Sequence, residues 1–268
     1  KIQYSREDFS NYFLGVLSAN QYYNNDEAFK YLNKIESKKN RHYRFKTEFL
    51  RTLVLLEKFN RAFNFSEEVW NKNEFLFEAD LLLGLNSFLK EDYIKAEKYF
   101  KRLNQTPEYD ILFGDFIGNV LLAWNSAEIG KQNDSYKFIQ KIPKIYNNLA
   151  KPQNVFLQCY FDTDKTYFYF KEMIADKNYN FSRYNFFFIN YLLFKDKFKE
   201  AEKVIRASTR NHSENLLLKQ TENFYLKKKE KKIKFFFNCK NSKDSIAEFF
   251  YLIANLYSHE KNYKMSNF

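Results

Sequence analysis

The chain has 268 residues, of which 45% are hydrophobic and 21% aromatic, and its net charge is +11. Five glycines and three prolines are too few for a fold built from strands and hairpins, so we expect an all-helical protein. The densest apolar run, Tyr184 to Phe194, is shorter than the about 20 residues that cross a bilayer. The sequence therefore predicts no transmembrane segment.

The positive charge indicates attraction to polyanions, but the kind of basic residue argues against nucleic acid as the main partner. Only 9 of the 44 basic residues are arginine, the side chain whose planar fork suits phosphates and bases. The densest basic run, Lys227 to Lys234, contains no arginine or interleaved aromatic residue, which is typical of a solvated helix face or loop. Binding to RNA or to an anionic surface is therefore the alternative hypothesis for function.

The N-terminal part of the chain predicts two pairs of helices. The first helix begins after Ser5, with Asp8 completing a short capping box, and runs to about Tyr23. Apolar residues at helical spacing predict its inner face as Phe9, Phe13, Val16 and Leu17. The second pair spans about His42 to Asn71, and its first helix is predicted to bury Phe45, Phe49, Leu53 and Leu56.

The clearest pair of helices lies between Phe77 and Leu103, joined by a tight polar turn. Small residues on each helix allow the two backbones to approach, and large ones fill the space beside them. The residues that we expect to pack in this pair are Leu83, Gly84, Tyr93, Ala96 and Phe100. Neither helix can bury its apolar face alone, so the pair needs neighbours on both sides.

The downstream pattern is less regular. A fourth pair covers Ile111 to about Ile142, and Pro143 and Pro152 are then expected to break the helices. From Arg183 a further pair runs through Ala201, and the last clean helix covers Ile246 to Glu260. A final helix begins at Tyr263 and stops at the chain end, so we expect the chain to be a piece of a longer protein.

Small residues recur at a fixed interval in the second helix of each pair. Ala96, Ala62 and Ala28 are each 34 residues apart, although only 13 of the 268 residues are alanine. The same pairing of an aromatic residue with a small one recurs as Phe198 with Ala201. We therefore predict repeat-packing roles for Ala28, Ala62, Gly84, Tyr93, Ala96, Phe100, Phe198 and Ala201.

A 34-residue period with Leu-Gly in the first helix, and with an aromatic residue before a small residue in the second, resembles the tetratricopeptide repeat (TPR). The match is best from Phe77 to Pro107 and poorest from Tyr109 to Tyr179. The order of features is similar to a group of alphaproteobacterial TPR proteins, with YFLGVLSA early, LLAWNSAEIG in the middle and SIAEFFYLIANLY late. The resemblance implies one superhelical domain over residues 1–268, a right-handed α-solenoid of about seven to eight stacked helix pairs.

The residue types that carry catalysis or bind cofactors do not form recognisable motifs. His42, His212 and His259 are far apart, no glycine-rich phosphate loop occurs, and the acidic pairs fall in predicted turns or solvent faces. Cys159 and Cys239 lie in different predicted repeats, so we expect two buried thiols rather than a disulfide. We predict no enzyme activity, no cofactor and no metal, and the cysteines leave both a cytoplasmic and a periplasmic location open.

The TPR resemblance implies that the first helix of each pair lines a concave groove. Counting from the position of Gly84 predicts that this groove receives Arg44, Thr47, Arg51, Arg183, Asn190 and Asn255. Arginine and asparagine can hold an extended peptide by its carboxylates and backbone amides. The leading hypothesis is a bacterial scaffold or adaptor that binds a protein or peptide; a helical domain attached to an enzyme in a longer chain is a second alternative.

Overall fold

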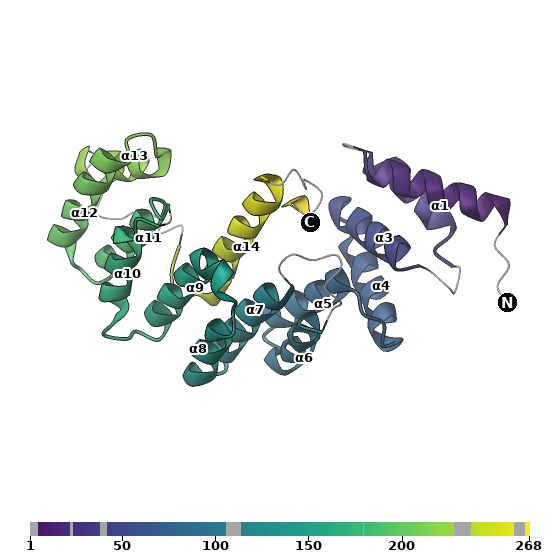
Figure 1. Cartoon of the computed structure of the whole chain (residues 1–268), viewed down its shortest axis with the longest axis horizontal. Helices are drawn as coiled ribbons and strands as arrows, with labels where there is room; N and C mark the ends of the chain where they lie inside the picture. The colour runs from purple at the N-terminus through teal and green to yellow at the C-terminus, as the bar shows by residue number, and fades with distance from the viewer. Residues whose placement is uncertain are drawn as a thin grey trace. The chain divides into compact units, whose positions relative to one another are not determined.

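The computed structural model describes residues 5–21, 24–37, 42–105, 114–178, 180–227, 237–259 and 266–268. Over these ranges the chain is all helical and contains no strand (Figure 1). Three predicted features lie wholly or mostly outside the described residues: the start of the helix predicted from Tyr263, Pro107, and the run Lys227 to Lys234. Within the described part, no helix combines the length and apolar character that a membrane span requires.

The chain divides into two compact units, Lys1–Gly118 with Ile253–Phe268 and Asn119–Leu252, which we call unit 1 and unit 2. The helices of unit 1 are α1 (Arg6–Ala19), α2 (Asn25–Lys34), α3 (Tyr43–Leu55), α4 (Phe59–Asn71), α5 (Phe77–Leu89) and α6 (Tyr93–Leu103). Unit 2 contains α8 (Gln132–Gln140), the 3₁₀ helix η1 (Lys144–Tyr146), α9 (Asn147–Tyr160), α10 (Thr166–Ala175), α11 (Tyr184–Phe194), α12 (Phe198–Asn211), α13 (Leu216–Glu222) and the π-helix η2 (Asn223–Lys227). Two helices, α7 (Gly114–Glu128) and α14 (Ser242–His259), have residues in both units.

Consecutive helices pack against one another within each unit. In unit 1 the pairs are α1 with α2, α3 with α4 and α5 with α6, and in unit 2 they include α9 with α10 and α11 with α12. Alternate helices also touch, since α3 contacts both α1 and α5, and α11 contacts α13. Each pair therefore covers an apolar face of the next, as expected of an all-α repeat fold.

The same turn ends the first helix of five pairs. Glu57, Glu91, Gly130, Asp162 and Asp196 all have a left-handed backbone, with φ between 53° and 75°, and they follow one another at intervals of 34, 39, 32 and 34 residues. In each case the next amide donates to a carbonyl five residues earlier, the 6→1 bond of a Schellman motif, at 2.8–3.0 Å. The repeat is thus visible in the backbone as well as in the sequence.

Small residues lie where the second helix of each pair crosses its neighbours. Ala28, Ala62, Ala96 and Ala201 are fully buried. Ser135 and Thr166 are also fully buried and continue the series in α8 and α10, where the sequence replaces alanine by a small polar residue. Both hydroxyls bond to a carbonyl, of Lys131 and Thr163 respectively, so they are buried without loss of a partner.

Gly84 provides the closest approach within the α5–α6 pair. A Cβ atom built on Gly84 would lie 2.6 Å from Cδ1 of Phe100, whose ring is fully buried. Tyr93 is half-buried and packs edge-on against Phe88 with the ring centroids 5.5 Å apart. Phe198 differs from the expected packing role, because 51% of it is exposed at the first residue of α12.

Helix α1 packs through a different face from the one predicted. Its start is confirmed, because Asp8 accepts from the Ser5 amide at 2.8 Å and Ser5 Oγ accepts from the Asp8 amide at 3.1 Å. The predicted inner face is wrong for its three large residues, which are 53–60% exposed: Phe9, Phe13 and Leu17. The buried face centres on Gly15, where a Cβ would lie 2.6 Å from Leu32 Cγ, so the crossing with α2 is too close for large side chains.

A buried ion pair joins α5 to α6. The Arg102 guanidinium donates to both carboxylate oxygens of Asp80, at 2.8 and 2.5 Å, and lies 3.7 Å from the ring centre of Trp70. Burial raises the pKa of Asp80 to about 6, although the Arg102 charge acts in the opposite direction. The pair orients the two helices through a fixed geometry rather than through apolar packing alone.

Candidate functional site

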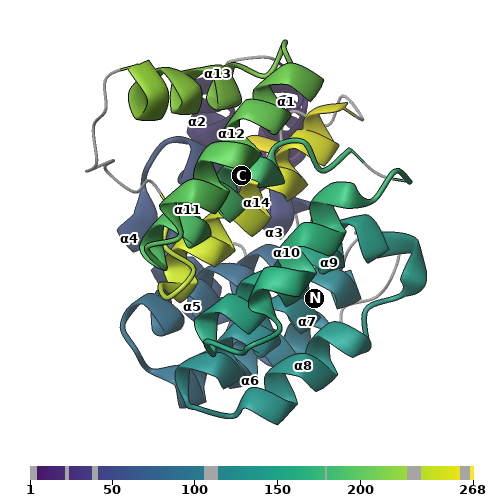
Figure 2. The ribbon, with the colours of Figure 1, turned by 90° about the vertical axis from the view of Figure 1, so that its left-hand side faces the viewer.

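A cavity of about 1000 Å³ lies in unit 2 between α8, α9 and α10, which Figures 1 and 2 show side by side. At 9 and 10 residues, α8 and α10 are shorter than the 14-residue α9 between them, so one face of α9 is left to line the cavity. The lining residues are Gln132, Tyr136, Ile139, Gln140, Ile142, Lys144, Asn147, Ala150, Lys151, Asn154, Val155, Gln158, Asp162, Thr163, Asp164, Lys165, Tyr169 and Glu172.

The orientation of α9 is set by its other face. The Trp124 indole N–H donates to Oε1 of Gln153 at 2.8 Å, and both side chains are fully buried. Phe156 packs against Phe187 and Phe237 with ring centroids 5.3 and 4.7 Å away. Because this face is fixed by buried contacts, the opposite face of α9 is held toward the cavity.

That opposite face carries a polar stripe. Asn147, Lys151, Asn154 and Gln158 follow at intervals of four, three and four residues, which places them on one side of the helix. Pro152 lies within α9, so the prediction that it breaks a helix is wrong. It stands in the second turn, where proline removes only one backbone hydrogen bond. The expected break at Pro152 hid the spacing of this stripe in the sequence.

The floor of the cavity is apolar and two tyrosines line its walls. Ile139, Ala150 and Val155 are buried beneath the polar stripe. Tyr136 and Tyr169 are half-buried, and Tyr136 lies 5.9 Å from the ring of Phe161. Burial raises the pKa of the Tyr136 phenol, so this hydroxyl stays protonated at neutral pH and can donate a hydrogen bond.

The charged residues that line the cavity balance one another. Three are lysines and three are acids, namely Lys144, Lys151, Lys165, Asp162, Asp164 and Glu172. Lys151 also pairs with Asp176, the residue after the end of α10, at 2.7 Å, and Asp162 pairs with Lys195 at 2.6 Å. The bond from Lys195 lowers the pKa of Asp162, which keeps this carboxylate ionised. The cavity therefore has no net charge that would select a polyanion.

These groups suit binding better than acid–base chemistry. The lining contains no histidine or cysteine, and the pKa values of Asp162 and Tyr136 are shifted away from neutrality rather than toward it. Across the described residues, no three of the His, Cys, Asp and Glu side chains are grouped as metal ligands. The amides of Asn147 and Asn154 each offer a donor next to an acceptor, and Gln158, whose Oε1 accepts from the Thr163 hydroxyl, offers its amide nitrogen as a donor.

The groove residues predicted from the sequence lie elsewhere. Arg44, Thr47 and Arg51 are on α3 in unit 1, and Arg183 and Asn190 belong to unit 2. Arg51 is ion-paired with Glu78, and Arg183 donates two bonds of 2.8 Å to Glu248. Both of these arginines are thus engaged inside their own unit.

The remaining groove residues divide between buried and exposed positions. Thr47 and Asn190 are buried, and the Asn190 amide nitrogen donates to the Phe186 carbonyl at 2.7 Å. Arg44 and Asn255 are exposed, on α3 and α14. The structure thus brings Arg44, Thr47 and Arg51 together on one helix, α3.

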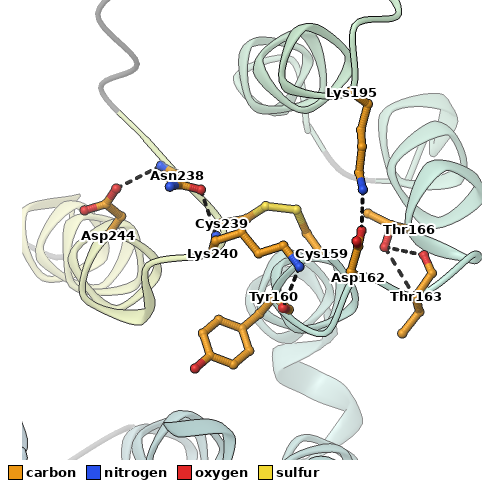
Figure 3. The surroundings of a disulfide bond; sticks show 10 residues. All are labelled: Cys159, Tyr160, Asp162, Thr163, Thr166, Lys195, Asn238, Cys239, Lys240 and Asp244. Atoms are coloured by element: carbon orange, nitrogen blue, oxygen red, sulfur yellow. Dashed lines mark hydrogen bonds and ion pairs between the residues drawn. A yellow bond between two sulfur atoms is a disulfide. The ribbon is translucent and has the colours of Figure 1, made fainter.

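The prediction of two separate thiols is wrong, because Cys159 and Cys239 form a disulfide with their Cα atoms 5.8 Å apart (Figure 3). Cys159 lies one residue from the C-terminal end of α9, and Cys239 lies just before α14. Counting repeats placed them in non-adjacent pairs, but the segment before α14 lies directly against α9. Sequence spacing could not show this contact, since the two residues are 80 positions apart.

The comparisons with known proteins identify no family. No protein-family model matches the chain, and no characterised protein matches it either.

Proposed function

We propose that the chain is a non-enzymatic α-solenoid scaffold of the TPR type, which binds an extended segment of a partner protein in the cavity between α8 and α10. The repeat assignment is supported by the recurring Schellman turns and the buried small residues at intervals near 34. The binding proposal is supported above all by the polar stripe on α9, which contains the amides of Asn147, Asn154 and Gln158.

The spacing of the amides suits a peptide backbone. Along a helix, Asn147, Asn154 and Gln158 rise by about 10 Å and then about 6 Å, which corresponds to roughly three and two residues of extended chain. A carboxamide can donate to a peptide carbonyl and accept from a peptide N–H at the same position. A peptide lying along α9 would thus meet a complementary group every two or three residues.

The other lining residues provide for side chains of the bound segment. The floor of Ile139, Ala150 and Val155 can accept one apolar side chain, and the tyrosines Tyr136 and Tyr169 can flank it. Lysines and acids in equal number favour a ligand with both signs of charge over RNA, which would require a net positive surface. A polypeptide is the macromolecule that combines these features.

A peptide array tests the proposal. The purified chain is applied to immobilised random peptides about twelve residues long, and selected sequences are measured by fluorescence anisotropy. Asn154→Ala should weaken binding about tenfold, because it removes a donor and an acceptor that contact the ligand backbone. Asn133→Ala is the matched control, since this residue is exposed on α8 outside the cavity.

The charge on the cavity wall is tested in the same assay. Lys144→Glu should change which peptides are selected, and Lys203→Glu, an exposed lysine on α12 outside the cavity, should not. Labelled oligouridylate is measured in parallel at physiological salt. Tighter binding of this RNA than of every selected peptide, with a steep salt dependence, would refute the proposal in favour of the RNA-binding alternative.

A further inference from the structure

The disulfide joins the segment before α14 to the end of α9 that borders the cavity. Cys159 directly follows Gln158, which lines the cavity, and it precedes the rim residues Asp162 and Thr163. Figure 3 shows Cys239 and its neighbour Lys240 beside this end of α9, with Asp162 and Thr163 on its far side. The disulfide-bonded Cys159 and the cavity residues Gln158, Asp162 and Thr163 thus lie within six consecutive residues, 158–163.

Non-covalent contacts accompany the disulfide. The Lys240 ammonium donates to the carbonyl of Tyr160 at 2.9 Å, which satisfies one of the free carbonyls at the C-terminus of α9. The backbone N–H of Asn238 donates to the carboxylate of Asp244 at 2.8 Å, which fixes the segment to the first turn of α14 (Figure 3). Residues 237–241 therefore form a short brace between α14 and α9.

The rim residues in turn depend on the geometry of the α9 end. Thr163 donates from its hydroxyl to Gln158 Oε1 at 2.6 Å and from its amide to the Gln158 carbonyl at 3.0 Å. Asp162 stands between them with φ of 53°, the left-handed position of the Schellman turn that ends α9. Movement of the helix end would therefore displace both the Gln158 amide and the rim carboxylate.

We propose that the Cys159–Cys239 disulfide is an oxidation-dependent brace that holds the cavity in its binding form. This regulation rests on the proposed peptide-binding function. A dithiol reductant opens the brace: one of its thiolates attacks a sulfur of the disulfide, and the second then closes the reductant into a cyclic disulfide. The reductant loses two electrons, and Cys159 and Cys239 each gain one electron and one proton.

Reduction removes the disulfide cross-link between residues 237–241 and α9. The segment is then held to α9 by the Lys240 bond and by the packing of Phe237 on Phe156, with the ring centroids 4.7 Å apart. Phe237 also packs on Phe187 of α11 at 4.6 Å. Its effective concentration at the α9 end falls, so the end of α9 opens more often. The expected consequence is a weaker peptide complex, because Gln158 and the rim are less well placed.

Hydrogen–deuterium exchange tests the brace without any ligand. Exchange is compared between the oxidised chain, the chain treated with dithiothreitol, and Cys239→Ser. Residues 158–165 should exchange at least about tenfold faster after reduction, while residues 77–103 in unit 1 should keep their protection. Unchanged exchange at 158–165 would overturn the proposal, and so would loss of protection in both regions, which would indicate a general staple.

A variant that keeps the disulfide tests the same brace by another route. Lys240→Met removes the bond to Tyr160 and should speed exchange at 161–165 two- to threefold in the oxidised chain. In the double variant Cys159→Ser/Cys239→Ser, dithiothreitol should change the exchange rate neither at residues 158–165 nor at residues 77–103.

Anisotropy with an array-selected peptide then measures the coupling to binding. Affinity should fall about tenfold on reduction of the wild type and stay constant in the double variant. Equal affinity in both redox states, with faster exchange at 158–165, would refute the regulatory role. Failure of every array peptide to bind the oxidised chain would overturn the proposed function and the regulation together, whereas the exchange result would still show whether the brace exists.

Discussion

Replacing Gly84 by alanine tests whether close approach of two backbones defines the helix pairs. At an exposed helix position, alanine is more favourable than glycine by about 1 kcal/mol, so helix propensity alone predicts that Gly84→Ala stabilises the protein. The structure predicts the opposite. The added Cβ would lie 2.6 Å from Cδ1 of Phe100, whereas carbon atoms in contact are normally about 3.5–4.0 Å apart.

The Phe100 ring cannot move aside freely, because it is fully buried. Overpacking of this kind costs up to about 3 kcal/mol, and subtracting the gain in propensity leaves a net destabilisation of about 2 kcal/mol. Urea denaturation followed by circular dichroism measures this difference. Equal or greater stability of Gly84→Ala would refute the reasoning.

A double-mutant cycle separates the steric effect from other causes. Phe100→Leu makes room for the new methyl group, so Gly84→Ala should cost at least about 1 kcal/mol less in that background. Gly130→Ala is the control, because no atom lies within 4 Å of its Cβ position and only its φ of 75° opposes alanine. Gly130→Ala should lower the unfolding free energy by the same amount whether residue 100 is phenylalanine or leucine. If the effects of Gly84→Ala and Phe100→Leu are simply additive, the packing explanation is wrong.

Three further predictions concern buried groups. Because burial raises the pKa of Asp80 to about 6, its stabilising contribution is present below about pH 4 and is lost as the pH rises through 6. The unfolding free energies measured in urea at pH 4 and pH 7 should therefore differ by roughly 2 kcal/mol more in the wild type than in Asp80→Asn. Cys239→Ser opens a link across 80 residues and should lower the unfolding free energy of unit 2 by about 4.5 kcal/mol in chemical denaturation, an effect that dithiothreitol should reproduce in the wild type. Trp124→Phe leaves the buried Gln153 amide without its donor and should cost about 2 kcal/mol in the same assay, part of which Gln153→Leu should recover.

Features that depend on neighbouring residues could be predicted from the sequence. The capping box joins Ser5 and Asp8, which are three positions apart, and the structure contains it. The recurrence of Ala28, Ala62 and Ala96 indicated second helices, because a small residue is needed wherever one helix crosses another closely. Thr166 continues the series, but its hydroxyl concealed it from a search for alanine.

The face that each helix buries was harder to predict. In α1 the large apolar residues Phe9, Phe13 and Leu17 have the spacing of a buried stripe, yet the face around Gly15 packs on α2. Because α1 and α2 cross too closely for large side chains, the face with the small residue Gly15 is the one that packs. Hydrophobic spacing alone does not report how near the neighbouring helix comes.

The amino-acid sequence by itself determined that the chain forms helices in pairs, because caps, turns and apolar spacing act over a few residues along the chain. Only the tertiary structure decided what the pairs enclose. The disulfide joins residues 80 apart, the Arg183 bond to Glu248 joins residues 65 apart, and the cavity combines α8, α9 and α10. Such contacts follow from how whole helices pack, and no local pattern in the sequence shows which distant residues will meet.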